Sequence, residues 1–311
     1  MKKIPVGQTI ARAYGFAFRD FVKILGVMWL PMAVMWLPGI FIQQRMLALQ
    51  AQMGPGNLNV FREMGLFLVP FYLVMFFLIF MQVIGIAKLA LGIKKKPDWI
   101  FFSAGKPVWR LIGTCLLLIV AMIVGWLAML LGGFLTGFVA GLLNKAVNNT
   151  GVHWAVAAVA IVILAALWCA YIYAFFRLAF LVVPVIAAEE QGFALARSWT
   201  LGLGNFWRIF LIALAVVLPF LVLEFVFLFG FMFRGIPFPA NPKDPAQSMA
   251  FQIAMNARML EMIQGMYHYW YLTFPLFIVV IVLFYGAYVS APCFAYQALI
   301  EGKASDPVAA D

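Results

Sequence analysis

Long apolar stretches dominate the chain, and the short segments between them carry most of the charged residues. A helix that crosses the hydrocarbon core of a bilayer needs about 20 apolar residues. Six stretches reach this length, at positions 24–42, 66–91, 111–143, 153–184, 209–231 and about 271–300. The pattern predicts an all-α fold, a polytopic membrane bundle of six transmembrane helices.

The composition favours the same class of protein. Hydrophobic residues make up 66% of the 311 positions, whereas charged residues make up only 10%. A water-soluble domain has roughly 25% charged residues, so this chain lacks the polar groups to cover a globular surface. The excess apolar surface is expected to face lipid, which excludes a cytoplasmic enzyme, a secreted domain and a disordered regulator.

The distribution of charge predicts the orientation. The chain has a net charge of +10, and loops rich in Lys and Arg alternate along it with loops that contain few of them. One side collects thirteen Lys and Arg residues and the other six, with Lys88 and Arg177 set aside because they lie at span ends. Basic loops stay in the cytoplasm. We therefore expect a bacterial inner-membrane protein with cytoplasmic termini, and the scattered charges do not favour nucleic-acid binding.

Two parts of the sequence that lie 185 residues apart resemble each other. Positions 11–14 (Ala-Arg-Ala-Tyr) match 196–199 (Ala-Arg-Ser-Trp), and 20–24 (Asp-Phe-Val-Lys-Ile) match 205–209 (Asn-Phe-Trp-Arg-Ile). A weaker copy lies at 106–110. A fixed offset indicates an internal repeat. We expect a single integral membrane domain, 1–311, built from three parallel two-helix units at about 5–91, 97–184 and 190–300.

Each unit begins with a segment that is predicted to be an interfacial amphipathic helix. Apolar residues recur at helical spacing in the first and third of these segments, as Ile10, Ala13, Tyr14, Ala17 and Phe21, and as Phe193, Ala196, Trp199 and Leu203. Such a helix lies at the membrane surface, with its aromatic side chains at headgroup level and its basic side chains near anionic lipid.

The third of these segments also carries a family likeness. Positions 196–201 (Ala-Arg-Ser-Trp-Thr-Leu), followed by 204–209 (Gly-Asn-Phe-Trp-Arg-Ile), resemble the signature of a bacterial membrane-domain family found fused to some glycerophosphoryl diester phosphodiesterases. The stretch from Arg177 to Pro184 is similar too. The resemblance implies a six-span inner-membrane protein. It implies no phosphodiesterase activity, because no soluble catalytic domain is present in this sequence.

Basic residues near the predicted membrane surface are the candidates for binding a lipid headgroup or an anionic substrate. They are Arg12, Lys23, Arg110, Arg177, Arg197 and Arg208. Each juxtamembrane Lys or Arg contributes about 1 kcal/mol at an anionic surface. The alternative for each is a topological anchor, and for Arg177 a side chain that snorkels to the interface. The expected partners are membrane phospholipids, and the sequence leaves a homo-oligomer or a membrane-protein partner open.

One acidic residue, Glu224, lies inside a predicted span. Intramembrane ionisable residues are costly and are functional candidates. The alternative is a protonated side chain, or one that reaches the outer surface. No second carboxylate accompanies it in a span, and Cys115, Cys169 and Cys293 lack metal-ligand spacing. We find no catalytic motif, so we expect neither an enzyme nor a cofactor.

Two further features concern packing. Gly133, Gly137 and Gly141 form a ladder of small residues, which lets membrane helices approach closely. The one long outer loop, about 232–267, contains an apolar pattern that predicts an amphipathic helix on the outer leaflet or a lid: Met249, Ile253, Leu260, Ile263 and Tyr267.

Two functions fit these patterns. The first is a non-enzymatic, lipid-interacting membrane protein with a role in membrane organisation or lipid homeostasis. The alternative is a transporter or permease for a small or amphiphilic anionic solute, with Arg177 and Glu224 at its site. A hydrated cavity that both residues reach would favour transport, whereas a solidly packed bundle would favour lipid binding.

Overall fold

The computed structural model describes residues 3–50, 58–93, 105–146, 150–189, 192–232, 241 and 244–304. These residues form helices, and no strand occurs among them. In chain order the helices are α1 (Val6–Arg19), α2 (Phe21–Gln50), α3 (Leu58–Ala90), α4 (Lys106–Ala146), α5 (Thr150–Ala179), α6 (Val182–Ala188), α7 (Ala194–Leu201), α8 (Phe206–Met232), α9 (Pro245–His268) and α10 (Trp270–Ala304).

Five stretches in the described part of the chain are long and apolar enough to cross a membrane. They are Arg62–Ala90 in α3, Lys106–Leu143 in α4, Trp154–Ala188 over α5 and α6, Phe206–Phe227 in α8 and Tyr271–Ile300 in α10. The apolar stretch of α2, Phe21–Val34, is shorter than a full span among the described side chains. The helices therefore indicate a multi-pass membrane protein, and the sixth predicted span stays a prediction.

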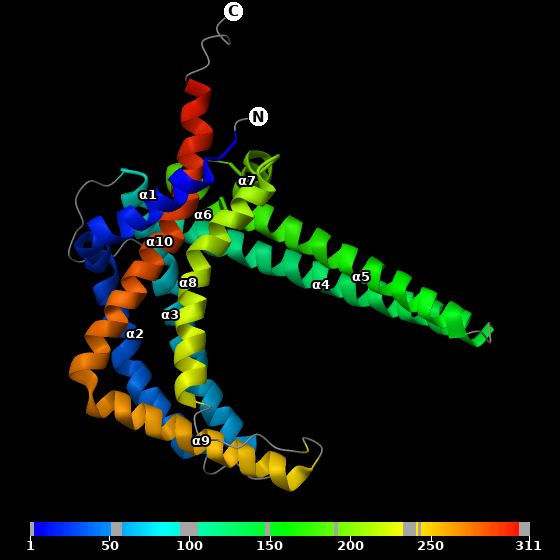
Figure 1. Ribbon diagram of the computed structural model, residues 1–311. Coiled ribbons are helices and arrows are strands. Elements are labelled where there is room, and N and C mark those ends of the chain that lie inside the picture. The colour runs from blue at the N-terminus through cyan, green and yellow to red at the C-terminus, as the bar shows by residue number, and fades with distance from the viewer. Residues whose placement is uncertain are drawn as a thin grey trace, which may run out of the picture.

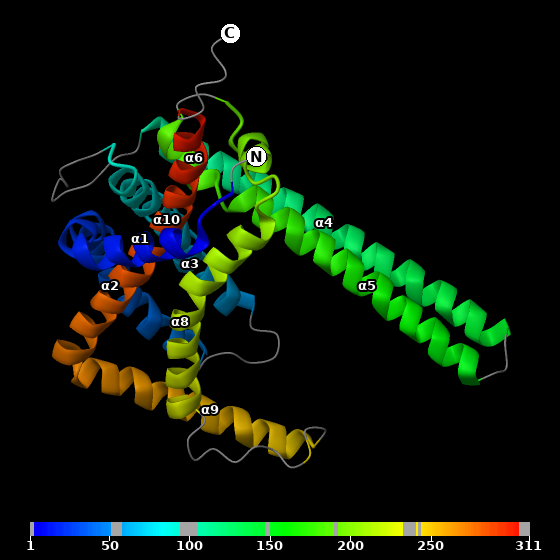
Figure 2. The same cartoon turned by 45° about the horizontal axis from the view of Figure 1, so that its top comes forward.

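The helices form a bundle with a projecting hairpin. Helices α2, α3, α8 and α10 run side by side, with α1, α6 and α7 at one end and α9 crossing the other (Figure 1). We call these the α1 end and the α9 end. Helices α4 and α5 pair with each other and project away from the bundle in both views (Figure 2).

The core lies at the α1 end and has α10 at its centre. Helix α10 packs against α1, α2, α3, α6 and α8. Gly286 permits the closest of these approaches, because an added Cβ would lie 2.9 Å from Ile24 Cδ1 and 3.1 Å from Ala17 Cβ. Large side chains from several helices fill the rest of this core, including Ile24, Met28, Met81, Ile84, Leu111 and Ile212.

The α4–α5 hairpin meets the bundle at its base, through α3, α6, α7 and α8. The apolar window of each of its two spans contains no buried residue. The predicted glycine ladder is largely wrong, since Gly137 and Gly141 face open space. The close approach to α5 instead occurs at Gly125 and Gly132, where an added Cβ would lie 2.8 Å from Tyr171 and 3.0 Å from Leu167.

The interfacial helices use faces that the sequence did not fully predict. Ala13 and Ala17 of α1 are buried, as are Thr9 and Phe16. This face packs on α10, while Arg12 and Arg19 on the same helix stay exposed. Helix α7 is different, because it packs through Ala194, Leu195 and Ser198 while the predicted face keeps Phe193, Ala196 and Leu203 exposed.

The predicted helix in the long outer loop is present as α9, which links α8 to α10 across the α9 end (Figures 1 and 2). Met249 and Ile253 are exposed, in keeping with a surface that meets lipid. The side chains of Leu260, Ile263 and Tyr267 lie outside the described ones. Residues 94–104, with the Lys94–Lys96 cluster and the start of the middle unit, also lie outside the described residues.

Candidate functional site

A polar pocket of about 370 Å³ lies at the α1 end, between α1, the first turn of α2, the last residues of α3 and α10. Its polar side chains are Arg12, Arg19, Asp20, Lys23 and Gln297, and the rings of Phe16 and Phe294 complete its wall. We call it the cationic pocket. It contains two residues predicted from the sequence, Arg12 and Lys23, which come from consecutive helices.

Asp20 organises this pocket. It lies between α1 and α2, directly before the first residue of α2, where Asp is favoured because a negative charge stabilises a helix N-terminus. Its backbone N–H donates to the Phe16 carbonyl at 2.9 Å, and its own carbonyl accepts from Ile24 N at 3.0 Å. The chain therefore turns from a surface helix into an apolar one at this residue.

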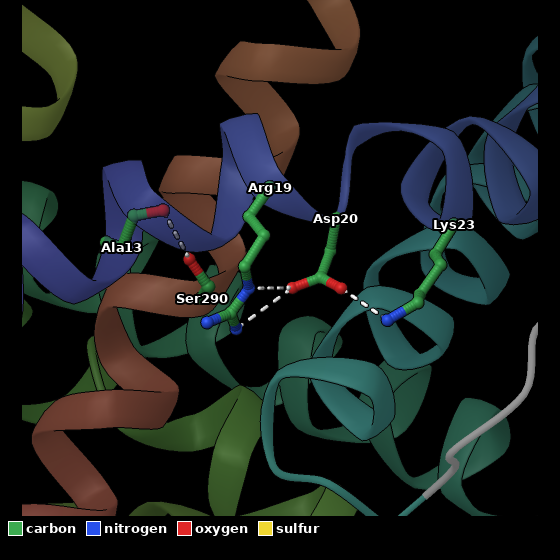
Figure 3. A network of polar contacts seen from close by, with 5 residues as sticks. All are labelled: Ala13, Arg19, Asp20, Lys23 and Ser290. Atoms are coloured by element: carbon green, nitrogen blue, oxygen red, sulfur yellow. Dashed lines mark hydrogen bonds and ion pairs between the residues drawn. The ribbon is translucent and has the colours of Figure 1, made fainter.

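The Asp20 carboxylate holds two of the three cations (Figure 3). Arg19 donates to Oδ2 from Nε at 3.2 Å and from Nη2 at 3.1 Å. Lys23 Nζ donates to Oδ1 at 2.5 Å. Ser290 Oγ donates to the Ala13 carbonyl at 3.5 Å and so joins α10 to α1 beside this network.

The charge of Asp20 is set by two opposing effects. Burial raises its pKa, but hydrogen bonds from Lys23 and Arg19 and their positive charges outweigh burial, so the pKa lies below its ordinary value. The carboxylate is therefore ionised at neutral pH. The three cations, Arg12, Arg19 and Lys23, against this one carboxylate leave a surplus of two positive charges.

Arg12 is exposed at the pocket wall, and its guanidinium lies over the ring of Phe294, with Cζ 5.1 Å from the ring centroid. This contact favours one orientation of the guanidinium, because an aromatic face attracts a cation. On the other side, Gln297 Nε2 donates to the Leu91 carbonyl at 3.5 Å and joins α10 to the end of α3. The pocket wall is therefore built from fixed elements.

Three other basic residues that were candidate ligands from the sequence, Arg110, Arg197 and Arg208, instead join segments of the protein. Arg110 donates from Nη1 to the Glu189 carbonyl and from Nη2 to the Gly192 carbonyl, at 2.5 and 2.8 Å. Arg197 Nε lies 3.1 Å from Glu189 Oε1, which also accepts from the Tyr296 hydroxyl at 2.8 Å. These contacts link the start of α4, the α6–α7 connection and the end of α10.

Arg208 has a similar role at the start of α8. Its Nη1 donates to the Ile4 carbonyl at 2.6 Å, and Asn205 Oδ1 accepts from Ile4 N at 3.0 Å. Together they hold the segment that precedes α1. Arg110, Arg197 and Arg208 thus make structural contacts in this protein, and none of them lines the cationic pocket.

Arg177 is buried, with 6% of its surface exposed, so its side chain does not reach the surface as the snorkelling alternative required. Its guanidinium lies over Trp199, with Cζ 3.8 Å from the ring centroid. Nε donates to the Trp199 carbonyl at 3.0 Å and Nη1 to the Tyr173 hydroxyl at 2.8 Å. Nη2 is buried without a hydrogen-bond partner in the described structure. Arg177 therefore joins α5 to α7.

Glu224 is exposed on the half of α8 nearer the α9 end. Arg177, by contrast, lies at the end of α5 that packs on α7. The two residues therefore do not meet, and neither lines the cationic pocket. Arg177 and Glu224 therefore do not share a hydrated cavity, which is the arrangement that would favour transport.

The sequence identified Arg12 and Lys23 as candidates but not Arg19 and Asp20. The missed signal is an acidic residue flanked by basic ones, at the point where an amphipathic segment changes into an apolar one. Across the described residues, no three His, Cys, Asp or Glu side chains come together in a way that could hold a metal ion.

Comparison with protein-family models, with curated proteins and with solved structures finds no match to this chain. The resemblance to the phosphodiesterase-associated membrane domain therefore stays a prediction from the sequence.

Proposed function

We propose that this protein is a non-enzymatic integral membrane protein that binds anionic phospholipid headgroups in the cationic pocket, with a role in membrane organisation or lipid homeostasis. The observation that carries the proposal is the surplus of two positive charges in a polar pocket at the end of long apolar helices. A phospholipid presents the matching combination, an anionic phosphate directly above hydrocarbon.

The geometry of the pocket suits a phosphate group. Its volume of about 370 Å³ is near the lower end of the range for ligand pockets, roughly 300–1,000 Å³. Guanidinium and ammonium groups form charge-assisted hydrogen bonds to phosphate oxygens. Asp20 holds Arg19 and Lys23 in place before a ligand arrives, so less side-chain entropy is lost on binding.

Orientation completes the proposal. The α1 end carries the basic segments that begin the first and third sequence units, and we assign it to the cytoplasm of a bacterial inner membrane by the positive-inside rule. With α2 counted as a sixth span, both termini lie on that side. The pocket would then face the cytoplasmic leaflet, whose anionic lipids attract basic residues.

The alternative function, transport of a small or amphiphilic anionic solute, has less support. A transport function would require Arg177 and Glu224 to share a hydrated cavity. Arg177 instead stacks on Trp199 within the protein, and Glu224 lies on the exterior of α8. We therefore favour lipid binding.

The test compares two double variants that each lose two positive charges. Arg12→Gln with Lys23→Gln changes the cationic pocket, whereas Arg45→Gln with Arg258→Gln changes exposed ion pairs elsewhere. Native mass spectrometry of the detergent-extracted proteins measures retained phosphatidylglycerol and phosphatidylethanolamine. At about 1 kcal/mol per basic residue, the pocket variant should bind phosphatidylglycerol roughly 30-fold more weakly.

The control variant should retain phosphatidylglycerol like the native protein. Equal retention by the pocket variant and the native protein would refute the proposal. A similar loss in both double variants would also refute it, because the effect would then come from overall charge.

A further inference from the structure

A second cavity lies where the α4–α5 hairpin leaves the bundle. It has a volume of about 340 Å³ and is surrounded by α3, α5, the α5–α6 turn, α6, α8 and α10. We call it the fork cavity. It differs from the cationic pocket in its lining, which is almost entirely apolar.

Aromatic and small aliphatic side chains form this lining. Phe175 and Phe176 come from α5, Phe180 from the following turn and Phe210 from α8. Phe176 and Phe210 are in edge-to-face contact, with centroids 5.3 Å apart. Val216, Val289 and Ala291 are buried at the back of the cavity.

The cavity opens sideways. Two of its lining residues, Leu214 of α8 and Tyr288 of α10, are exposed and form its rim. Below this level the hairpin and α8 diverge in both views (Figures 1 and 2). The apolar windows of the hairpin spans contain no buried residue, so the space between hairpin and bundle is bordered by apolar surface.

Neither water nor a void suits such a cavity. A buried water needs two to four polar partners, and cavities lined by Leu, Ile and Phe stay dry. An empty cavity loses dispersion contacts along its whole lining. Because the opening faces apolar helix surface within the predicted membrane, the available filler is the hydrocarbon of the bilayer.

We propose that the fork cavity binds one acyl chain of a membrane phospholipid, which enters laterally between the hairpin and the bundle. Binding depends on the hydrocarbon chain and not on headgroup charge, since the lining carries no charged side chain. The chain fills the apex of the fork and connects α5 with α8 and α10.

This site is separate from the cationic pocket. On α10 the fork cavity uses Tyr288, Val289, Ala291 and Pro292, whereas the cationic pocket uses Phe294 and Gln297. The two sites have no lining residue in common. The inference therefore holds whether or not the cationic pocket binds a headgroup.

The test uses phosphatidylcholine with a photoreactive diazirine at the end of one acyl chain, incorporated into phosphatidylcholine vesicles with the full-length protein. After irradiation, mass spectrometry of the peptides locates the label. Ala213→Trp fills the cavity from α8, and Ala179→Phe fills it from α5 in case the first variant fails to fold. Ala128→Trp, on the exposed surface of α4, is the matched control.

In the native protein and in Ala128→Trp, the label should concentrate in segments 175–183 and 210–217. Both cavity-filling variants should lose at least most of this label, whereas Arg12→Gln with Lys23→Gln should keep it. A uniform distribution of the label over all exposed helices would overturn the inference. Unchanged labelling of the two segments in folded Ala213→Trp or Ala179→Phe would also overturn it. Either result would mean that no acyl chain occupies the cavity, and that a second copy of the protein or nothing fills it.

Discussion

At the scale of single residues, Asp20 and Asn205, which match each other at the 185-residue offset in the sequence, have two different roles. Each precedes the first residue of an apolar helix, and each accepts a backbone hydrogen bond four residues on, from Ile24 N and Ile209 N. The Asp20 side chain, however, holds Arg19 and Lys23, whereas the Asn205 side chain accepts from Ile4 N. The cationic pocket therefore accompanies Asp20.

Asp20→Asn should change both stability and lipid binding. Because the folded pKa of Asp20 lies below its ordinary value of 3.8, its stabilising contribution is complete above that value and is lost as the pH falls through the folded pKa. The partners are half or more exposed, so the loss in the variant at neutral pH should be only about 1 kcal/mol.

Thermal unfolding in detergent, measured over a pH series, tests this effect. The native protein should lose stability below about pH 4, and Asp20→Asn should show a flatter acid limb. The variant should also retain more phosphatidylglycerol, since raising the pocket surplus from two charges to three outweighs the loss of the exposed ion pairs that hold Arg19 and Lys23. An acid limb identical to that of the native protein would contradict the assigned role of Asp20.

Arg177 is expected to be structural. Arg177→Ala should lower the free energy of unfolding by about 2–4 kcal/mol, because it removes two hydrogen bonds, the stacking on Trp199 and buried side-chain volume. Arg177→Lys should also destabilise the protein, since an ammonium group lacks the planar fork. Chemical unfolding gives the stability change, while lipid retention should stay unchanged. A stable variant that loses anionic lipid would instead make Arg177 a headgroup ligand.

At the scale of elements, the sequence predicts the helices well and their packing poorly. Long apolar runs with at most one charged residue form helices in a membrane, because the backbone must satisfy its own hydrogen bonds there, so α4, α8 and α10 are recognisable from length and hydropathy. Their surroundings are not, because lipid tails are as apolar as Leu side chains. Helix α4 is largely exposed and α10 is largely buried at the α1 end, although both are almost continuously apolar.

The candidate site follows the same rule. The sequence does not distinguish a basic residue that faces a ligand from one that joins two segments, because both lie at the end of an apolar span. Arg12 and Lys23 line a pocket, while Arg110, Arg197 and Arg208 donate to carbonyl or carboxylate oxygens of other segments. Those partners lie 8 to 204 positions away, and no local pattern identifies them.

Two glycines on α4 provide a matched test of the hairpin. Gly125→Leu should disturb the α4–α5 contact, because even a Cβ would lie 2.8 Å from the Tyr171 ring. Overpacking of this kind costs about 1–3 kcal/mol. Gly137→Leu adds the same side chain on the same helix where no atom lies within 4 Å.

Thermal unfolding in detergent should place Gly137→Leu close to the native protein and Gly125→Leu several degrees lower. If both variants unfolded at the same temperature as the native protein, the pairing of α4 with α5 at Tyr171 would be wrong.

At the scale of the whole molecule, the protein has a packed half and an open half. The core joins α1, α2, α3, α6, α8 and α10 at the α1 end, whereas the hairpin is attached at its base and diverges from the bundle (Figure 1). The fork cavity lies at this junction, whereas the cationic pocket lies at the α1 end and shares no lining residue with it. An α1 end at the cytoplasmic surface would give the cationic pocket access to the anionic leaflet.

Binding of anionic lipid in the cationic pocket depends most directly on which side of the membrane each end of the bundle occupies. Cys115, Cys169 and Cys293 would be replaced by Ala, and a single Cys introduced at an exposed position of α1 (Gln8→Cys) or α9 (Gln252→Cys). Intact bacterial cells would then be treated with a membrane-impermeant maleimide, before and after lysis.

We expect Gln252→Cys to react in intact cells and Gln8→Cys to react only after lysis. Reaction of Gln8→Cys in intact cells, with Gln252→Cys protected, would place the cationic pocket on the outer surface. Recovery of the protein in the soluble fraction without detergent would refute its assignment as a membrane protein, because it would mean that the long apolar helices do not lie in a bilayer.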